Sequence, residues 1–496
     1  MTDAARNTIY ALASALPTRS GGAGVAVIRL SGPRACDALV FLTEPGAFAR
    51  GGSARDPALP EPRRPVLRPF LDPANGEVID RGLAMRFAAP RSYTGEDVVE
   101  FHLHGGRAVI DAALAAIARL PFCRLAEPGE FTRRAFEHGK LDLTAAEGVA
   151  DLVGAETAAQ RRQALRQVDG ALGRLYEAWR ASLLRALAHL EADIDFPDED
   201  LPQGVAEAVR PELAGLRSAI AGHLADRRGE RLRDGVSIAI VGPPNAGKSS
   251  LLNLIAQRDA AIVSTVAGTT RDVIDVHLDL DGYPVTIADT AGLRRSHDPI
   301  EQEGVRRARA RAETADLRLL VVPAADDDGQ ALDWPALAHD AIAALSTWSP
   351  DTDLVIVNKA DLLGAADPGP EGHHGIASMR LSARTGAGVP ELLGRLGATV
   401  ATLLGDAPGA NDPAPLAASD NMLAPPPLTR ARHREALADC LAALDRALAA
   451  SADGVAPAEL VAEDVRLAAR ALGRITGRVG VEDLLDVIFR DFCIGK

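Results

Sequence analysis

The residues best suited to chemistry form a glycine-rich stretch, GPPNAGKS, at positions 242–249. It fits the pattern G-x-x-x-x-G-K-S/T and lies between an apolar run, VSIAIV, and a run of helical character, which is the setting that this pattern needs. There, glycines let backbone N–H groups close around phosphates, and the helix N-terminus adds its positive end. Lys248 is expected to reach the outer phosphates, and the hydroxyl of Ser249 to join Mg²⁺. The stretch predicts a nucleoside triphosphate site, because its context makes a chance match in a glycine-rich loop a poor alternative.

Two further segments point to the metal and the terminal phosphate of the same nucleotide. AGTTRD supplies Thr270 as the expected second hydroxyl on Mg²⁺. IADTAG is predicted to end a strand, with Asp289 near the metal and the backbone N–H of Gly292 available to the terminal phosphate. Ras-type GTPases position the attacking water with a glutamine directly after that glycine, but this chain has Leu293. Leucine cannot orient water, so another group must do so or hydrolysis is slow.

The base is predicted to be guanine. VIVNKAD places Asn358, Lys359 and Asp361 after another predicted strand, and LSART can close over the base from the far side. An aspartate accepts two hydrogens from the edge of guanine, whereas adenine offers the opposite pattern. Four motifs in this order predict a GTP-binding domain. The expected nucleotide contacts are Asn245, Ala246, Gly247, Lys248, Ser249, Ser250, Ser264, Thr265, Thr269, Thr270, Asp289, Thr290, Ala291, Gly292, Asn358, Lys359, Asp361, Ser382, Ala383 and Arg384.

Composition restricts the class of protein. The net charge of −14 and pI of about 5.3 exclude a bulk basic field that recruits nucleic acid. An RNA contact must therefore come from local arginine patches such as RRGERLRD or RRARARAE, although exposed helix faces carry such charges routinely. Four cysteines without a CxxC pair predict neither a disulfide framework nor a zinc site, and a cytoplasmic location fits best. No stretch is long enough for a membrane span.

Lysine is scarce in this chain. Of 54 basic residues only four are lysines, Lys140, Lys248, Lys359 and Lys496. Arginine and lysine differ where a compact, flexible point charge is needed in place of a planar fork. The four lysines therefore mark candidate functional positions, with codon bias and chance survival as the alternative.

The elements that must position these residues fall into three predicted domains. Residues 1–138 mix predicted strands, including NTIYALAS, GVAVIRLSG and DVVEFHLHGG, with a helix at RAVIDAALAAIARL. Residues 139–228 and 405–496 have helical periodicity, apart from a Pro/Ala-rich linker near 405–427. Residues 229–404 alternate apolar strands with helices, as a GTPase domain does. The pattern predicts one helical domain into which the α/β domain is inserted.

The whole chain resembles one family, the tRNA modification GTPase family MnmE, also called TrmE. The resemblance rests on AVIRLSG, SYTGEDVVEFHLHGG, PGEFTRRAFEHGKLDLTAAEGVADLV, FPDED, GPPNAGKSSLLN, AGTTRD, DTAGLR and the closing CIGK. It implies a Ras-like P-loop GTPase domain inserted into an α-helical domain. An α+β N-terminal domain similar to folate-binding proteins, which binds tetrahydrofolate and forms dimers, would precede both.

The resemblance also assigns a second ligand. A reduced folate, 5-formyl- or 5,10-methylene-tetrahydrofolate, would serve as one-carbon donor and contact Arg29, Glu100, Lys140 and the terminal Lys496. Arginine and lysine can pair with the carboxylates of a folate glutamate tail. Cys493 beside such a ligand suggests a nucleophile, but the sequence shows no feature that would lower its pKa, and a packed or exposed thiol is the alternative.

For GTP hydrolysis the resemblance implies that two GTPase domains meet around K⁺. The ion would supply charge where other systems insert an arginine finger. Its ligands would come from Asn245, Ser264, Val266 and Thr269; the family more often has threonine where Ser264 stands. The catalytic residue that positions water would be Glu301 in DPIEQEG, with an ordinary exposed glutamate as the alternative.

The activity implied is a K⁺-dependent GTPase that modifies C5 of the tRNA wobble uridine, U34. Its partner would be the FAD-dependent protein MnmG in a heterotetramer, since no flavin motif occurs here, and the product a carboxymethylaminomethyl or aminomethyl group. Two rivals are open at this stage. One is a ribosome-assembly GTPase of the Era or Der type, although Era has a KH domain after its GTPase domain and Der has two GTPase domains. The other is a folate enzyme with a merely regulatory GTPase.

Overall fold

The structure is a computed structural model, and it is described here for most of the chain. The described residues are 7–14, 23–49, 59–195, 205–257, 261–262, 275–289, 311–326, 328–345, 347–363, 378–405, 425–452, 457–480, 482–490, 492 and 494–495. They form two compact units. One unit comprises Met1–Ala150, Gln167–Glu199 and Pro457–Lys496, and the other comprises Asp151–Arg166 and Asp200–Ala456.

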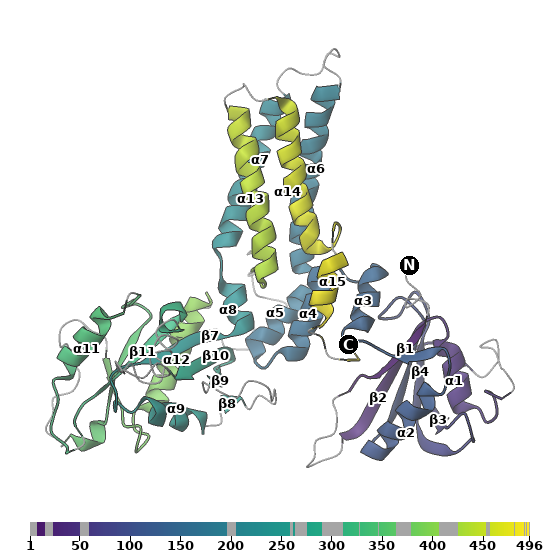
Figure 1. The fold of residues 1–496 in the computed structure, drawn as a ribbon, viewed down its shortest axis with the longest axis horizontal. Coiled ribbons are helices and arrows are strands. Elements are labelled where there is room, and N and C mark those ends of the chain that lie inside the picture. The colour runs from purple at the N-terminus through teal and green to yellow at the C-terminus, as the bar shows by residue number, and fades with distance from the viewer. Residues whose placement is uncertain are drawn as a thin grey trace, which may run out of the picture. The chain divides into compact units, whose positions relative to one another are not determined.

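The first unit contains a six-stranded sheet, drawn in purple and blue in Figure 1, in the order β3-β4-β5-β2-β1-β6. Its strands are β1 (Thr8–Leu12), β2 (Ala23–Ser31), β3 (Val66–Leu71), β4 (Val78–Phe87), β5 (Val98–Gly105) and β6 (Cys123–Leu125). All neighbours pair antiparallel except β1 and β6, which pair parallel. The strands predicted from NTIYALAS, GVAVIRLSG and DVVEFHLHGG are confirmed as β1, β2 and β5.

Two helices cover one face of this sheet. They are α1 (Ala35–Thr43) and α2 (Arg107–Ala118), the latter confirming the predicted helix. Their apolar side chains join those of β2 and β5 in one buried core in which Ile28, Leu30 and Phe101 are at most 1% exposed. Alternation along β2, where Ala26, Ile28 and Leu30 point inward, leaves Val27 and Arg29 on the other face. This pleat places Arg29 on the sheet face opposite the two helices.

The remaining helices of the first unit follow the sheet or come from the end of the chain. They are α3 (Glu130–Glu137), α4 (Leu143–Gly154, up to Ala150), α6 (Ala171–Asp195), α14 (Ala458–Thr476) and α15 (Glu482–Arg490). The long helices α6 and α14 pack along each other. α15 packs on α3, where Gly129 lies so close that an added methyl group would come within 2.8 Å of the carbonyl oxygen of Phe489. Helix α15, late in the chain, is thereby fixed to the helix that follows the N-terminal sheet.

The second unit contains a seven-stranded sheet, in the order β13-β12-β11-β7-β10-β9-β8. Its strands are β7 (Val236–Val241), β8 (Ala261–Ile262), β9 (Asp275–Leu280), β10 (Tyr283–Asp289), β11 (Leu317–Pro323), β12 (Leu354–Asn358) and β13 (Ser378–Arg380). The five strands from β13 to β10 are parallel, and β9 and β8 are antiparallel additions. All residues of β11 and β12 are buried, as expected for parallel strands covered on both faces.

Helices on both faces of this sheet bury its apolar side chains. α9 (Lys248–Ala256) and α12 (Val389–Leu403) cover one face, and α11 (Trp334–Ala343) covers the other. A short 3₁₀ helix, η2 (Ala360–Leu362), follows β12. α5 (Ala158–Val168, up to Arg166), α7 (Val205–Ala225), α8 (Arg228–Asp234) and α13 (Ala431–Ala452) complete the unit, in which α7 and α13 pack together. The predicted fold is confirmed: an α/β domain of P-loop type lies between two helical segments, after an α+β N-terminal domain.

Candidate functional site

The glycine-rich loop joins β7 to α9 and is shaped by close backbone contacts. A methyl group on Gly242, whose φ is +144°, would come within 2.0 Å of the carbonyl oxygen of Val321. At Gly247, with φ of +90°, it would come within 2.2 Å of Nδ2 of Asn358. Asn245 takes the left-handed conformation with φ of 60°. Glycine is therefore required at both ends of the loop for steric as well as conformational reasons.

Lys248 is the first residue of α9 and is 7% exposed. Its ammonium donates to the carbonyl oxygens of Gly242 at 3.0 Å and Pro243 at 2.8 Å, so its charge lies across the loop. Ser249 and Ser250 are exposed in the first turn of the same helix. An ammonium group, hydroxyls and a helix N-terminus thus meet at one loop, which is the donor set that phosphate oxygens require.

Asn358, the last residue of β12, connects three segments that bear the expected nucleotide contacts. Its Nδ2 donates to the carbonyl oxygen of Ala246 at 2.8 Å, and its Oδ1 accepts from the backbone N–H of Ala383 at 2.9 Å. The side chain is 2% exposed, so both bonds are shielded from water. The phosphate loop and the LSART loop are therefore held to the same strand end.

Asp361 lies in η2, close to the LSART loop. Its carboxylate accepts from Oγ of Ser382 at 2.6 Å and pairs with the guanidinium of Arg384 at 2.7 Å. The hydrogen bond from Ser382, reinforced by the charge of Arg384, holds the pKa of Asp361 below its usual value in spite of partial desolvation. Lys359 precedes it in the left-handed conformation, with φ of 63°. The carboxylate is thus ionised, oriented and able to accept hydrogens from a guanine edge.

The other expected site residues lie at the end of β10 or outside the described ranges. Asp289 ends β10 and pairs in register with Ile240 of β7, so its backbone lies beside the strand that leads into the phosphate loop. The remaining residues fall outside the described ranges: Ser264, Thr265, Val266, Thr269, Thr270, Thr290, Ala291, Gly292 and Glu301. Within the described ranges, no group of three or more His, Cys, Asp or Glu residues could hold a metal.

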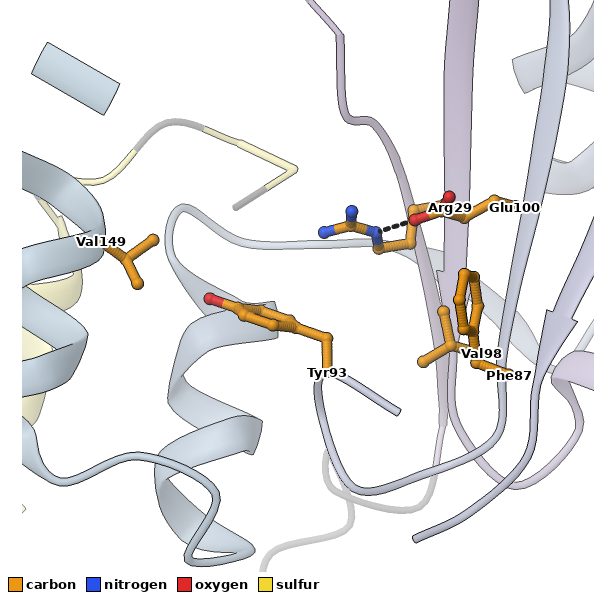
Figure 2. A pocket seen from close by; sticks show the side chains of 6 residues that line it. All are labelled: Arg29, Phe87, Tyr93, Val98, Glu100 and Val149. Atoms are coloured by element: carbon orange, nitrogen blue, oxygen red, sulfur yellow. Dashed lines mark hydrogen bonds and ion pairs between the residues drawn. The ribbon is translucent and has the colours of Figure 1, made fainter. Parts of the chain in front are cut away.

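A pocket of about 320 Å³ lies on the face of the N-terminal sheet opposite α1 and α2. Figure 2 shows the Arg29–Glu100 pair on the strands and the Tyr93 ring pointing toward Val149 of α4. Residues Arg29 and Glu100 are directly opposite in the β2–β5 register, and Nε of Arg29 donates to Oε1 of Glu100 at 2.8 Å. The structure therefore brings together two of the four residues predicted to contact a folate.

Two aromatic rings lie close to this guanidinium. The Cζ atom of Arg29 lies 5.6 Å from the ring centre of Tyr93 and 5.8 Å from that of Phe131. The hydroxyl of Tyr93 is hydrogen-bonded to Oγ1 of Thr132 at 2.8 Å. Burial raises the pKa of Tyr93, against the opposing effects of Thr132 and Arg29, so the phenol stays protonated at neutral pH. Phe87, Tyr93 and Phe131 were not predicted as site residues, although the motifs SYTGEDVVEF and PGEFTRRAFEHGK contain Tyr93 and Phe131.

Lys140 and the end of the chain also belong to this part of the first unit. Nζ of Lys140 donates to the carbonyl oxygen of Pro90 at 2.8 Å, which places it beside the loop that carries Tyr93. Ile494 forms a β-bridge with Pro128, and a methyl group on Gly495 would come within 2.2 Å of the carbonyl oxygen of Leu12. Lys496 and Cys493 lie outside the described residues.

Comparison with known proteins identifies the family. A model described as "GTP-binding protein TrmE N-terminus" matches residues 8–140, and one described as "MnmE helical domain" matches residues 143–493. The tRNA modification GTPase MnmE of Parvibaculum lavamentivorans is 57% identical over 491 residues, which cover 99% of this chain and all of that protein. The chain belongs to the MnmE family of tRNA modification GTPases.

Other MnmE relatives match the chain over nearly its full length. The MnmE protein of Rhodospirillum rubrum is 52% identical over 494 residues, 99% of each chain. A mitochondrial 5-taurinomethyluridine tRNA synthase subunit of Homo sapiens is 47% identical over 498 residues, 99% of this chain and 93% of that protein. The resemblance to the MnmE family that the sequence motifs indicated is thereby confirmed. Among the described residues, no helix is both long and apolar enough to cross a membrane.

Three of the cysteines in this MnmE chain are described, and all three are free thiols. Burial raises the pKa of Cys123 and Cys440 to about 12, and it also raises the pKa of Cys36. These thiols are therefore protonated at neutral pH and lack thiolate character. The nucleophile hypothesis concerns Cys493 alone.

Proposed function

We propose that this protein is a K⁺-dependent GTPase that modifies the wobble uridine of tRNA with a one-carbon unit from a reduced folate. The observation that carries the proposal is the presence of two binding geometries in one MnmE family chain. One is the phosphate loop joined to the guanine-reading segments through Asn358. The other is the Arg29–Glu100 pocket, which the aromatic side chains of Phe87 and Tyr93 also line.

GTP would lie across the carboxyl ends of β7, β10 and β12, where ligands bind in open α/β sheets. The phosphates would bind to the loop at residues 242–249 and to the ammonium of Lys248, and the base would hydrogen-bond to Asp361. Supporting this, the carboxylate of Asp361 is ionised and fixed by Ser382 and Arg384.

The hydroxyls of Ser249 and Thr270 would hold Mg²⁺, an ion that prefers oxygen ligands and would neutralise charge between the outer phosphates. The exposed position of Ser249 in the first turn of α9 suits this assignment. When two GTPase domains meet, a K⁺ ion would bind to Asn245, Ser264, Val266 and Thr269. Glu301 would then position the attacking water.

The pocket on the N-terminal sheet would bind a reduced folate. Aromatic rings at Phe87 and Tyr93 suit a flat heterocycle, the carboxylate of Glu100 can accept its N–H groups, and Arg29 can pair with an anionic oxygen. Lys140 lies beside the same loop, and Gly495 places the end of the described chain at β1, next to the strand that bears Arg29. These positions support a folate contact by Lys140 and by Lys496.

The remaining elements of the proposal concern assembly. The chain would act as a homodimer through its N-terminal domain and with MnmG, which would supply the flavin. Its domains would be residues 1–138, 139–228 with 405–496, and 229–404. GTP hydrolysis would open and close the GTPase domains and alter the folate site through the helices.

Mass analysis of tRNA nucleosides tests this function. A strain that lacks the gene should lose the C5-substituted wobble uridine, and the intact gene should restore it. A strain that keeps the modified uridine but accumulates immature ribosomal particles would instead support a ribosome-assembly GTPase.

A further inference from the structure

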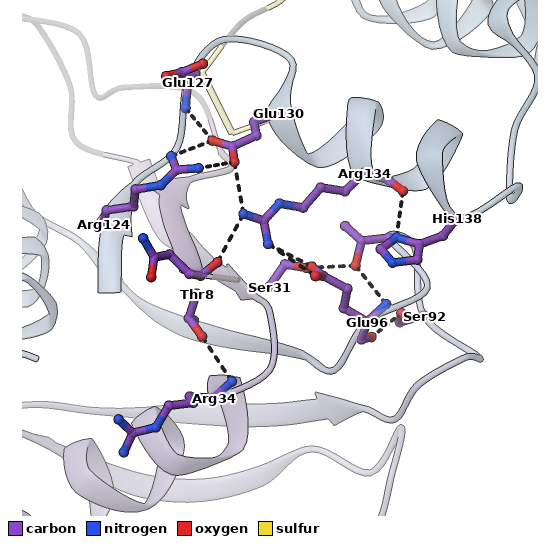
Figure 3. A network of polar contacts seen from close by, with 12 residues as sticks. Thr8, Ser31, Arg34, Ser92, Glu96, Arg124, Glu127, Glu130, Arg134 and His138 are labelled. Atoms are coloured by element: carbon purple, nitrogen blue, oxygen red, sulfur yellow. Dashed lines mark hydrogen bonds and ion pairs between the residues drawn. The ribbon is translucent and has the colours of Figure 1, made fainter. Parts of the chain in front are cut away.

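A largely buried, charge-balanced network of ion pairs lies beside the pocket. It contains two arginines and two glutamates on three segments: Arg124 on β6, Glu130 and Arg134 on α3, and Glu96 in the loop before β5 (Figure 3). The side chain of Arg134 is 4% exposed, that of Glu130 10% and that of Glu96 13%. A buried pair is expensive to form and strongly fixes the segments that it joins.

Arg134 is the centre of this network. Its Nη1 donates to both carboxylate oxygens of Glu96, at 3.0 and 3.3 Å, and its Nη2 donates to Oε1 of Glu130 and to the carbonyl oxygen of Asn7, both at 3.0 Å. Glu130 in turn accepts two bonds from Arg124. Helix α3 is thus fixed to β6, to the start of β1 and to the loop at Glu96.

Glu96 carries the connection into the loop that lines the pocket. Its Oε2 also accepts from Oγ of Ser31 at 2.8 Å, and that hydroxyl is 2.7 Å from Oγ1 of Thr94. The backbone carbonyl of Glu96 accepts from Oγ of Ser92, which closes the loop on itself. Tyr93 lies between these anchors, so the position of its ring depends on them.

Helix α3 also holds the other end of Tyr93. The hydroxyl of Tyr93 is 2.8 Å from Oγ1 of Thr132, two residues before Arg134 on the same helix. The loop packs against the end of α3 as well, because a methyl group on Gly95 would come within 2.9 Å of Cβ of His138. The position of Tyr93 is therefore fixed in two ways: its loop is anchored through Glu96, and its hydroxyl is hydrogen-bonded to Thr132.

We propose that Glu96, paired with Arg134, is a positioning residue that sets the Tyr93 wall of the pocket and thereby its affinity for a reduced folate. Glu96 does not line the pocket and acts through Tyr93. The inference rests on the proposed folate-binding function and adds residues to it. A pocket wall displaced by a fraction of an ångström loses contact with a flat ligand, so loosening the loop weakens binding.

The test is the affinity of the full-length protein for 5-formyltetrahydrofolate, measured by calorimetry. Glu96→Gln keeps the size of the side chain and a partner for Ser31, but removes the charge that faces Arg134. It should weaken binding about tenfold, because binding sites tolerate little misplacement. Glu127→Gln, which changes an exposed carboxylate in the turn before α3, is the matched control and should bind as the wild type does.

A double-mutant cycle separates positioning from general stability. In a Tyr93→Ala background, Glu96→Gln should change affinity by less than about twofold, since residues that act through one another are not additive. If Glu96 has a purely structural role, Glu96→Gln lowers the affinity for the folate by the same factor in both backgrounds. That result would overturn the inference. Thr132→Val, which removes the partner of the Tyr93 hydroxyl and leaves the charges intact, should also weaken binding and serves if Glu96→Gln folds poorly.

The possible outcomes distinguish the two proposals. If the wild type binds the folate and both Glu96→Gln and Thr132→Val bind equally well, the positioning role is wrong and the folate site stands. If the wild type shows no binding, the folate assignment itself is wrong and the inference fails with it.

Discussion

The side-chain amide of Asn358 donates to the carbonyl oxygen of Ala246 across 112 residues of sequence, at 2.8 Å. The same amide accepts from the N–H of Ala383. One side chain therefore holds the loop expected to bind phosphates at a fixed distance from the segment expected to enclose the base. A nucleotide has a fixed distance between its phosphates and its base, so this link suits one ligand spanning both.

Asn358→Ala should weaken GTP binding and destabilise the GTPase domain. It leaves the buried carbonyl of Ala246 and the N–H of Ala383 without their partner, at a cost of about 1–3 kcal/mol. Urea unfolding and nucleotide titration measure the two effects. The control is Asn253→Ala, an exposed change on α9, and equal stability of the two variants would contradict the prediction.

Asp361→Asn should change the preferred base from guanine to xanthine. The carboxylate accepts two hydrogens from guanine, whereas an amide presents one donor and one acceptor, which match the carbonyl and N–H edge of xanthine. GTP affinity should fall about a hundredfold, since two charged hydrogen bonds are lost, while xanthosine triphosphate gains. Asp351→Asn, at an exposed position, should change neither affinity. Undiminished GTP binding by Asp361→Asn would place the base elsewhere.

The K⁺ and Glu301 assignments predict a kinetic result. GTP turnover should be fast in K⁺ and slow in Na⁺, because the ion would stabilise transition-state charge only if it fits its ligands. Glu301→Ala should retain nucleotide affinity but lose turnover about a hundredfold, as expected for a group that positions water. Glu303→Ala provides a neighbouring control. Equal rates in both salts would contradict the ion site. Normal turnover of Glu301→Ala would show that another group positions the attacking water.

His223 predicts a loss of stability in mild acid. It is 4% exposed in α7, and burial lowers its pKa from 6.5 to about 4, against the charge of Asp226 and with smaller contributions from His433 and Arg434. The unfolded chain therefore binds more protons between these values, so stability is full above pH 6.5 and falls as the pH decreases toward 4. Backbone hydrogen exchange in α7 and α13 should report about 1 kcal/mol less protection at about pH 5.5 than at about pH 7.5.

His223→Gln should remove most of this pH dependence, because glutamine does not titrate. His189→Gln changes an exposed histidine and should leave the pH dependence as it is in the wild type. A stability profile that is flat over this range in the wild type would show that His223 is accessible to protons in the folded chain.

The sequence predicted the nucleotide site more completely than the pocket. Strands such as β7 and β12 are continuous apolar runs, and parallel strands bring the residues that follow them to one sheet edge. The phosphate loop and NKAD motif therefore indicated a site before any contact was known. Arg29 and Glu100 came only from the family resemblance, although their opposition in the β2–β5 register explains why both were expected in one place.

Tyr93, Glu96 and Arg134 show what the sequence did not reveal. Arg134 meets Glu96 over a separation of 38 residues, between a short helix and an irregular loop. Helix α3 is amphipathic, but Arg134 lies on its buried side, where a hydrophobic pattern does not place a charge. An arginine next to another arginine in EFTRRAFE reads as surface charge. Only the packing of α3 against the sheet distinguishes buried Arg134 from Arg133, which pairs with Asp486 at the surface.

The contact of Gly495 with Leu12 has a consequence for how the protein is made. At about 5–20 residues per second, a ribosome needs tens of seconds to travel from one of these positions to the other. During that time the end of β1 at Leu12 has been synthesised, but the segment that contacts it has not. An N-terminal sheet that forms in this interval lacks the contact, and a chain truncated before α15 would retain the strands that carry Arg29 and Glu100 but not the segment that contacts Leu12.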